Sequence, residues 1–149
     1  MQREVLIFLV SDQTGGAVEQ DRIEVITAGQ YFYKNGKHYV IYDEISEESG
    51  QTVKNIIKIY DGGTEIIKSG DSSVHMVFEE HKKDFSYYDM PYGKMFVSLE
   101  TNRLDIREEE DRISVKIDYR LEIDYQHMAD CLVEIRIESK ENCKMNLGR

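Results

Sequence analysis

The sequence predicts an all-β domain in which one antiparallel up-and-down meander closes into a barrel of about eight to ten strands. Apolar and polar residues alternate along most of the chain, which is typical of strands with one buried and one solvated face. The runs are separated by turns short enough to join antiparallel neighbours. A single Pro, with 10 Tyr and 5 Phe, favours strands over coils.

The first expected strand is VLIFLV, residues 5–10, which is too short to cross a bilayer. An export signal is the alternative, but Glu4 lies against this run and SDQTGG follows it in place of a small-residue cleavage site. We therefore expect a strand here, and a cytoplasmic protein.

The next two strands form a hairpin around Asn35-Gly36 in TAGQYFYKNGKHYVIYDE, residues 27–44. Asn-Gly readily adopts the positive φ angles of a type I′ turn, so the loop fixes the register. The expected pairs are Tyr33 with His38, Tyr31 with Val40, Gly29 with Tyr42, and Thr27 with Glu44. Gly29 would let the Tyr42 ring lie over bare backbone and would permit a sharp bend.

Alternation of side chains gives this hairpin one more apolar face, which we expect to point inward. That face carries Ile23, Val25, Tyr31, Tyr33, Val40 and Tyr42. The opposite face would leave Phe32, Tyr39 and Ile41 on the exterior.

The same pattern predicts seven further strands, at residues 51–60, 64–69, 74–80, 85–88, 94–106, 112–124 and 131–139. The clearest is 112–124, where apolar and polar residues alternate strictly. The only helical candidates are residues 125–130 and part of 81–89, and neither has a sustained apolar stripe.

An open meander of this many strands would leave two long edges that invite aggregation, and closure into a barrel removes them. A two-sheet β-sandwich is the alternative, because alternation alone does not separate the two. We expect one barrel domain at residues 1–138, followed by a polar tail at 139–149.

Charge and cysteine content exclude several classes of protein. A net charge of −10 argues against binding to nucleic acid or to an anionic membrane, since both require a cationic face. Cys131 and Cys143 fit neither a disulfide framework nor a zinc spacing, so we expect thiols in a reducing compartment.

Several blocks occur in a recognisable order: RIEVITAGQYFYKNGKHYVIYDE, TVKNIIKIYDGGTEIIKSG, Met76-x-Phe78, Met90-Pro91-Tyr92-Gly93 and RISVKIDYRLEI. Together they resemble the YwiB-like family of uncharacterised bacterial proteins, over roughly residues 3–138. Lys68 stands where this resemblance leads us to expect Arg. The resemblance implies a calycin-like (lipocalin-type) β-barrel, which favours the barrel over the sandwich, and it implies no catalytic residues.

No motif predicts a catalytic residue, a metal or a cofactor. EEHKKD at 79–84 and REEED at 107–111 are interpreted as solvated turns, because neither has the ligand spacing of a zinc or calcium site. There is no G-x-S-x-G nucleophile motif, and DGG at 61–63 lies between strands with no helix to follow.

The candidate ligand site comes from polar residues on the inferred inward face. We expect Glu44, Thr27 and Asn55 to surround one mouth of the lumen and to orient a ligand's polar group. Tyr31, Tyr42, Met76 and Phe78 would form its apolar wall. The alternative is that Glu44 reaches water at the strand end while the aromatic side chains fill a packed core.

Three functions remain open at this point. The first is a non-enzymatic barrel that binds a small apolar or amphipathic molecule. The second is a structural or interaction module with a packed lumen, forming a homodimer through Phe32 and Ile41. An enzyme ranks third, because no nucleophile–base pair or metal set can be identified.

Overall fold

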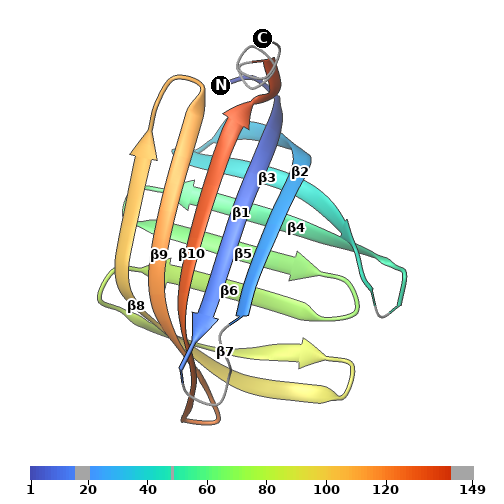
Figure 1. Cartoon of the computed structure of the whole chain (residues 1–149), viewed down its shortest axis with the longest axis vertical. Coiled ribbons are helices and arrows are strands. Elements are labelled where there is room, and N and C mark those ends of the chain that lie inside the picture. Colours follow the sequence, from blue (N-terminus) through green and yellow to red (C-terminus); the bar gives the residue numbers. More distant parts are fainter. Residues whose placement is uncertain (16–20, 48, 142–149) are drawn as a thin grey trace.

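Ten antiparallel strands form a closed barrel in a computed structural model that describes residues 1–15, 21–47 and 49–141. The strands are β1 (Glu4–Thr14), β2 (Asp21–Lys34), β3 (Lys37–Ile45), β4 (Thr52–Tyr60), β5 (Gly63–Ser69), β6 (Ser73–Glu79), β7 (Lys83–Met90), β8 (Gly93–Glu108), β9 (Arg112–Ile123) and β10 (Gln126–Ser139). In Figure 1, β1, β9 and β10 run nearly vertically in front, and β4, β5 and β6 cross behind them at a steep angle. The predicted barrel is confirmed.

The barrel closes where the first strand meets the last. β1 pairs with β10 from Val5–Ser139 to Thr14–Asp130, and along its other edge β1 pairs with β2. Every strand therefore has a neighbour on both sides, and no strand has a wholly unpaired edge of the kind that an open meander would leave.

The β2–β3 hairpin has the expected turn but a shorter ladder. Asn35 and Gly36 have φ angles of 52° and 75°, as a type I′ turn requires. The pairs Tyr33–His38 and Tyr31–Val40 are confirmed, but the ladder ends at Gln30–Ile41. The predicted pairing of Thr27 with Glu44 is wrong: Thr27 lies opposite Ile7 of β1, and Glu44 lies opposite Val53 of β4.

Gly29 is the corner at which β2 changes its neighbour: residues 21–30 pair with β1, and residues 30–34 pair with β3. A Cβ atom there would lie 2.7 Å from Cδ1 of Ile7 and 2.8 Å from the backbone oxygen of Ile41. The Tyr42 Cβ would be 3.3 Å away, so the expected closeness of Gly29 and Tyr42 holds although no ladder pair joins them. Only glycine fits this bend, and the bend is what turns a hairpin into part of a barrel.

Both helical candidates are wrong. Asp124 and Tyr125 have φ angles of 50° and 67° and form the turn into β10, which starts at Gln126. A register shift between His127 and Ala129 had hidden the alternation of this strand. Residues 83–90 form β7.

The last strand reaches one residue into the expected tail. Ser139 ends β10 and is buried, and its hydroxyl donates a 3.0 Å hydrogen bond to Oδ1 of Asp111. Lys140 and Glu141 are helical, and the remainder of the tail, including Cys143, lies outside the described residues.

The interior is filled mainly by the inward rows of aliphatic side chains. The fully buried members include Val5, Ile7, Val40, Ile57, Ile59, Phe78, Leu99, Ile113, Ile117, Ile135 and Ile137. Two members of the predicted inward row, Ile23 and Tyr33, are 51% and 61% exposed, and both lie close to an end of β2. Cys131 is buried, and the loss of hydration raises the pKa of its thiol.

One pair of neighbours is only loosely joined. Between β6 and β7 the single ladder pair is Ser73–Asp89, whereas the ladder from β7 to β8 runs from Lys83–Glu100 to Met90–Gly93. Asp84 lies on β7 at this β6–β7 seam and is partly buried. Burial raises the pKa of its carboxyl, an effect that His75 opposes and Glu79 reinforces.

Gly29→Ala should lower the free energy of unfolding by about 1–3 kcal/mol, because the added methyl group meets backbone that cannot move without breaking the corner. Urea denaturation measures this loss. Gly70→Ala is the matched control: its Cβ would lie 3.0 Å from a methyl group of Val53 and 3.3 Å from the Val53 Cα, longer than the contacts at Gly29, so its loss should be smaller. Equal stability of Gly29→Ala and the wild type would contradict the role of this corner.

Asp84→Asn should stabilise the protein at neutral pH. Because the folded-state pKa of this carboxyl is raised, the wild type loses stability as the pH rises from the unfolded-state to the folded-state pKa. Asn does not titrate, so the variant does not lose this stability. Its free energy of unfolding should therefore exceed that of the wild type at pH 7, and the difference should vanish in acid. Denaturation curves at several pH values test this, with Asp43→Asn on the outer face of β3 as control. An advantage that persists in acid would refute the electrostatic origin.

Candidate functional site

The two mouths of the barrel contain hollows of about 520 and 500 Å³. The connections β3–β4, β5–β6 and β7–β8 surround the first, which we call the Glu44 mouth. The turns β2–β3 and β4–β5 and the end of β8 surround the second, which we call the His38 mouth. His38 and Glu44 lie near opposite ends of β3, so the two hollows are at opposite ends of the barrel.

An ion pair lies at the rim of the Glu44 mouth. Nζ of Lys68 is 3.2 Å from Oε1 of Glu44, and these side chains are 39% and 33% exposed. The apolar part of the lining comes from Ile45, Val53, Met90, Pro91 and Tyr92. A charged pair beside an apolar wall can hold a molecule that has both a polar group and an apolar part.

Asn55 lies one layer deeper, with Tyr42 and Lys68 as its ladder partners on either side. It is completely buried. Its Nδ2 donates a 3.3 Å hydrogen bond to the carbonyl of Val53, while Oδ1 has no partner among the residues that the structure describes. Burial, and to a lesser degree Glu44, raises the pKa of the Tyr42 hydroxyl, which therefore stays protonated.

The structure brings together only some of the predicted site residues. Tyr42, Glu44 and Asn55 are neighbours at one mouth, through the pairing of β3 with β4. Thr27 lies apart from them, on the part of β2 that pairs with β1. Tyr31 points toward the opposite mouth, where its hydroxyl meets His38.

The two remaining predicted wall residues belong to the core. Phe78 is fully buried, with its ring centroid 4.8 Å from that of Tyr119. Met76 is half-buried and packs against the same core. Around these side chains the middle of the barrel is a packed interior.

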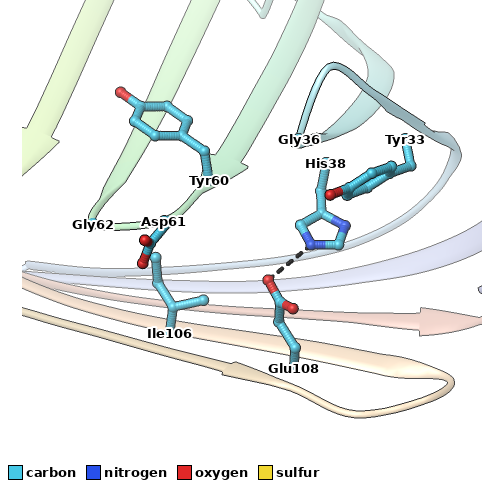
Figure 2. A pocket seen from close by; sticks show the side chains of 8 residues that line it. All are labelled: Tyr33, Gly36, His38, Tyr60, Asp61, Gly62, Ile106 and Glu108. Atoms are coloured by element: carbon cyan, nitrogen blue, oxygen red, sulfur yellow. Dashed lines mark hydrogen bonds and ion pairs between the residues drawn. The ribbon is translucent and has the colours of Figure 1, made fainter.

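A hydrogen-bonded chain of three side chains spans the His38 mouth. Nδ1 of His38 is 2.8 Å from the Tyr31 hydroxyl, and its Nε2 is 2.8 Å from Oε1 of Glu108. Figure 2 shows the imidazole pointing at Glu108, with Ile106 and Asp61 on the other side of the hollow. Because β3 and β8 are not neighbours in the barrel, these hydrogen bonds connect opposite parts of its wall.

The chemistry of the chain follows from its donors and acceptors. Glu108 accepts a hydrogen bond from Nε2–H, so in the neutral imidazole Nδ1 accepts one from the Tyr31 hydroxyl. Burial and the nearby Glu108 raise the pKa of Tyr31, which keeps the phenol a donor. His38 is thus held by partners on both sides, with a side chain only 12% exposed.

Sequence reasoning missed Glu108 because it placed residues 107–111 in a solvated turn, which is wrong for 107 and 108: β8 runs to Glu108, and a β-bulge sets which of its side chains point inward. Before the bulge, Val97, Leu99 and Thr101 point inward; after the register shift between Thr101 and Arg103, the even positions Leu104, Ile106 and Glu108 do so. The sequence does contain a signal for this change of phase. The apolar residues switch from odd to even numbers between 99 and 104.

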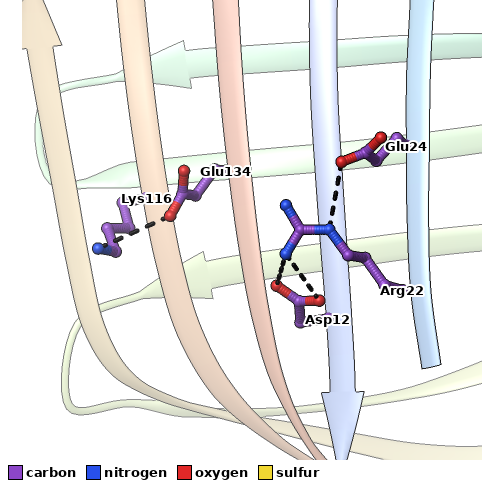
Figure 3. A network of polar contacts seen from close by, with 5 residues as sticks. All are labelled: Asp12, Arg22, Glu24, Lys116 and Glu134. Carbon is purple, nitrogen blue, oxygen red and sulfur yellow. Dashed lines mark hydrogen bonds and ion pairs between the residues drawn. The ribbon is translucent and has the colours of Figure 1, made fainter. Parts of the chain in front are cut away.

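The outer wall carries solvated ion pairs. Figure 3 shows Arg22 between Asp12 and Glu24, with Lys116 beside Glu134, on the outside of β1, β2, β9 and β10. Exposed pairs of this kind contribute little stability. In the described ranges, no group of three or more His, Cys, Asp or Glu side chains could hold a metal ion. The described part of the chain also has no helix long and apolar enough to span a membrane.

Comparisons with known proteins confirm the family resemblance and the fold. The profile of the family described as "Domain of unknown function (DUF1934)" matches residues 7–135. The "Uncharacterized beta-barrel protein YwiB" of Bacillus subtilis (strain 168) is 29% identical over 111 residues, covering 73% of this chain and 77% of that protein. The crystal structure of ywiB protein from Bacillus subtilis matches with a TM-score of 0.80 at 21% identity, over 92% of both chains.

His38→Asn should lower the free energy of unfolding by about 1–2 kcal/mol, because it breaks two hydrogen bonds of a mostly buried side chain. Chemical denaturation measures the change. His81→Asn is the control: its side chain is 79% exposed and its φ angle of 64° suits Asn. If both variants were equally stable, the chain across the mouth would not contribute to the fold.

Proposed function

The chain belongs to the DUF1934 family, and we propose that this member binds a small, partly apolar molecule at the Glu44 mouth of its barrel. The observation that carries the proposal is the half-buried Glu44–Lys68 pair at the rim of this hollow. Lys68 is the ladder partner of Asn55, whose buried Oδ1 has no hydrogen-bond partner in the part of the chain that the structure describes. Buried polar atoms in folded proteins are nearly always hydrogen-bonded, so such an atom beside Val53 and Lys68, which line the hollow, favours a polar occupant.

The polar part of the ligand is defined by what these three side chains offer. Oδ1 of Asn55 accepts a hydrogen bond, so the ligand should carry an N–H or O–H donor. Nζ of Lys68 donates a 3.2 Å hydrogen bond to Oε1 of Glu44. A charged group on the ligand would replace one of these two side chains as the partner of the other.

The apolar part of the ligand would lie against Val53, Met90 and Tyr92, in a hollow of about 520 Å³. Such a volume is within the usual range for small-molecule sites. Because Tyr42 and Phe78 occupy the interior below, the proposal places the molecule in the mouth instead of deep in the lumen.

The same proposal includes a calycin-like classification and a cytoplasmic location. The closed antiparallel barrel supports the first. The thiol of Cys131, which is free and buried, supports the second, because small secreted domains usually use their cysteines in disulfides.

Native mass spectrometry of protein purified from its own host should show a retained small molecule on the wild type. Lys68→Met and Asn55→Leu should each reduce the retained fraction at least about tenfold, since each removes a polar partner. Lys54→Met, on the outward face of the same β4 strand, is the matched control and should leave retention unchanged.

Stability separates binding from folding in this experiment. Asn55→Leu removes an oxygen that has no partner among the described residues, together with the 3.3 Å hydrogen bond from Nδ2 to the Val53 carbonyl. The variant should therefore lose no more than about 1 kcal/mol of stability while losing the ligand. A wild type that retains nothing, or a Lys68→Met variant that retains as much as the wild type, would contradict the proposed function.

A further inference from the structure

An aromatic cluster covers part of the outer wall of the barrel. It consists of Phe85 and Tyr87 on β7, Phe96 on β8 and Tyr125 in the β9–β10 turn, and we call it the aromatic platform. The ring of Phe96 is central, with centroid distances of 5.8 Å to Phe85, 5.1 Å to Tyr87 and 5.3 Å to Tyr125. The three outer rings are 52%, 67% and 75% exposed.

The outward face of a strand in a water-soluble barrel is normally polar, so four contiguous rings need an explanation. The position of Tyr125 is a second sign that these rings have a role beyond the fold. It has a φ of 67°, in a two-residue turn whose second position favours Gly, so the turn itself does not require a large ring there. Contiguous exposed aromatic residues of this kind are typical of the centre of a protein–protein contact.

Charges of both signs surround the aromatic platform. Nζ of Lys83 lies 5.6 Å from the ring centroid of Phe85, and Asp89 and Lys94 are opposite each other on β7 and β8. Asp124 precedes Tyr125 in the turn. A rim with both carboxylates and ammonium groups around an apolar centre is complementary to itself, which is the requirement of an isologous contact.

We propose that the aromatic platform is the contact surface of a homodimer, in which two copies of this chain meet about a two-fold axis. The two clusters of rings bury each other, and the acidic rim residues of one copy face the basic rim residues of the other. For a chain with a net charge of −10, this locally balanced surface is a place where two copies approach without strong repulsion. The proposal does not rest on the ligand at the Glu44 mouth.

The surface predicted from the sequence, around Phe32 and Ile41, is a weaker candidate. The ring of Phe32 is 41% exposed and already stacks on Tyr39, with centroids 4.8 Å apart and planes within 5°. Ile41 is half-buried. This patch therefore offers less unpartnered aromatic surface than the platform, and it provides a control.

Dimerisation would also stabilise one side of the loosely joined β6–β7 seam. β7 carries Phe85 and Tyr87 but pairs with β6 only at Ser73–Asp89. Contact with a second copy would hold β7 in place from outside, so its amides should exchange more slowly in the dimer than in the monomer.

Sedimentation equilibrium of the full chain, from about 1 to 200 µM, tests the proposal. We expect a monomer–dimer equilibrium whose dissociation constant rises at least about tenfold in Tyr87→Glu. Phe32→Glu makes the same change from ring to carboxylate on the outer wall of β2 and should leave the constant unchanged. Tyr125→Gly should also weaken the dimer, although Gly suits the turn and should preserve or raise monomer stability.

Hydrogen exchange at low and high protein concentration supplies a second readout. Amides of β7 should gain protection with concentration in the wild type and not in Tyr87→Glu. A wild type that stays monomeric over the whole range would overturn the proposal, even if a different protein were found on this surface. So would a dimer that Phe32→Glu dissociates and Tyr87→Glu does not.

Discussion

The pairing of β1 with β10 is the contact on which the rest of the structure depends. Every other ladder joins strands that follow each other in sequence, whereas this one joins the first strand to the last and closes the longest loop of the chain. Its inward side chains, among them Ile7, Ile135 and Ile137, are almost completely buried. Without this ladder the inner face of both strands would be open to water.

Much of this fold is predictable because its determinants are local. The turn at Asn35-Gly36, and the strict alternation over residues 112–124, each depend on neighbouring residues and lead directly to a hairpin and a strand. Gly29 could be recognised as a bend, but the strand that pairs with β2 before this residue is β1, which contains the distant residue Ile7. For that reason the expected contact between Thr27 and Glu44 is absent.

The candidate site shows the same division. Tyr42, Glu44 and Asn55 were placed together because the pairing of β3 with β4 follows from alternation and a short connection. Glu108 was missed because residues 107–111 were expected to form a solvated turn, whereas β8 runs to Glu108 and a bulge turns the even positions of its second half inward. Its partner His38 is 70 residues away, and no local pattern connects the two. The resulting molecule has a packed aliphatic interior with polar groups at its two mouths, and an unpartnered aromatic surface on its outer wall.

The most direct test of this account is a solution measurement of the β1–β10 ladder. In NMR spectra of the full chain, we expect nuclear Overhauser effects between backbone protons of opposed residues such as Leu9 and Ile135, together with slow amide exchange along both strands. The absence of these cross-strand effects, with amides of β1 exchanging as fast as those of a frayed terminus, would show that the barrel is open and would contradict the account.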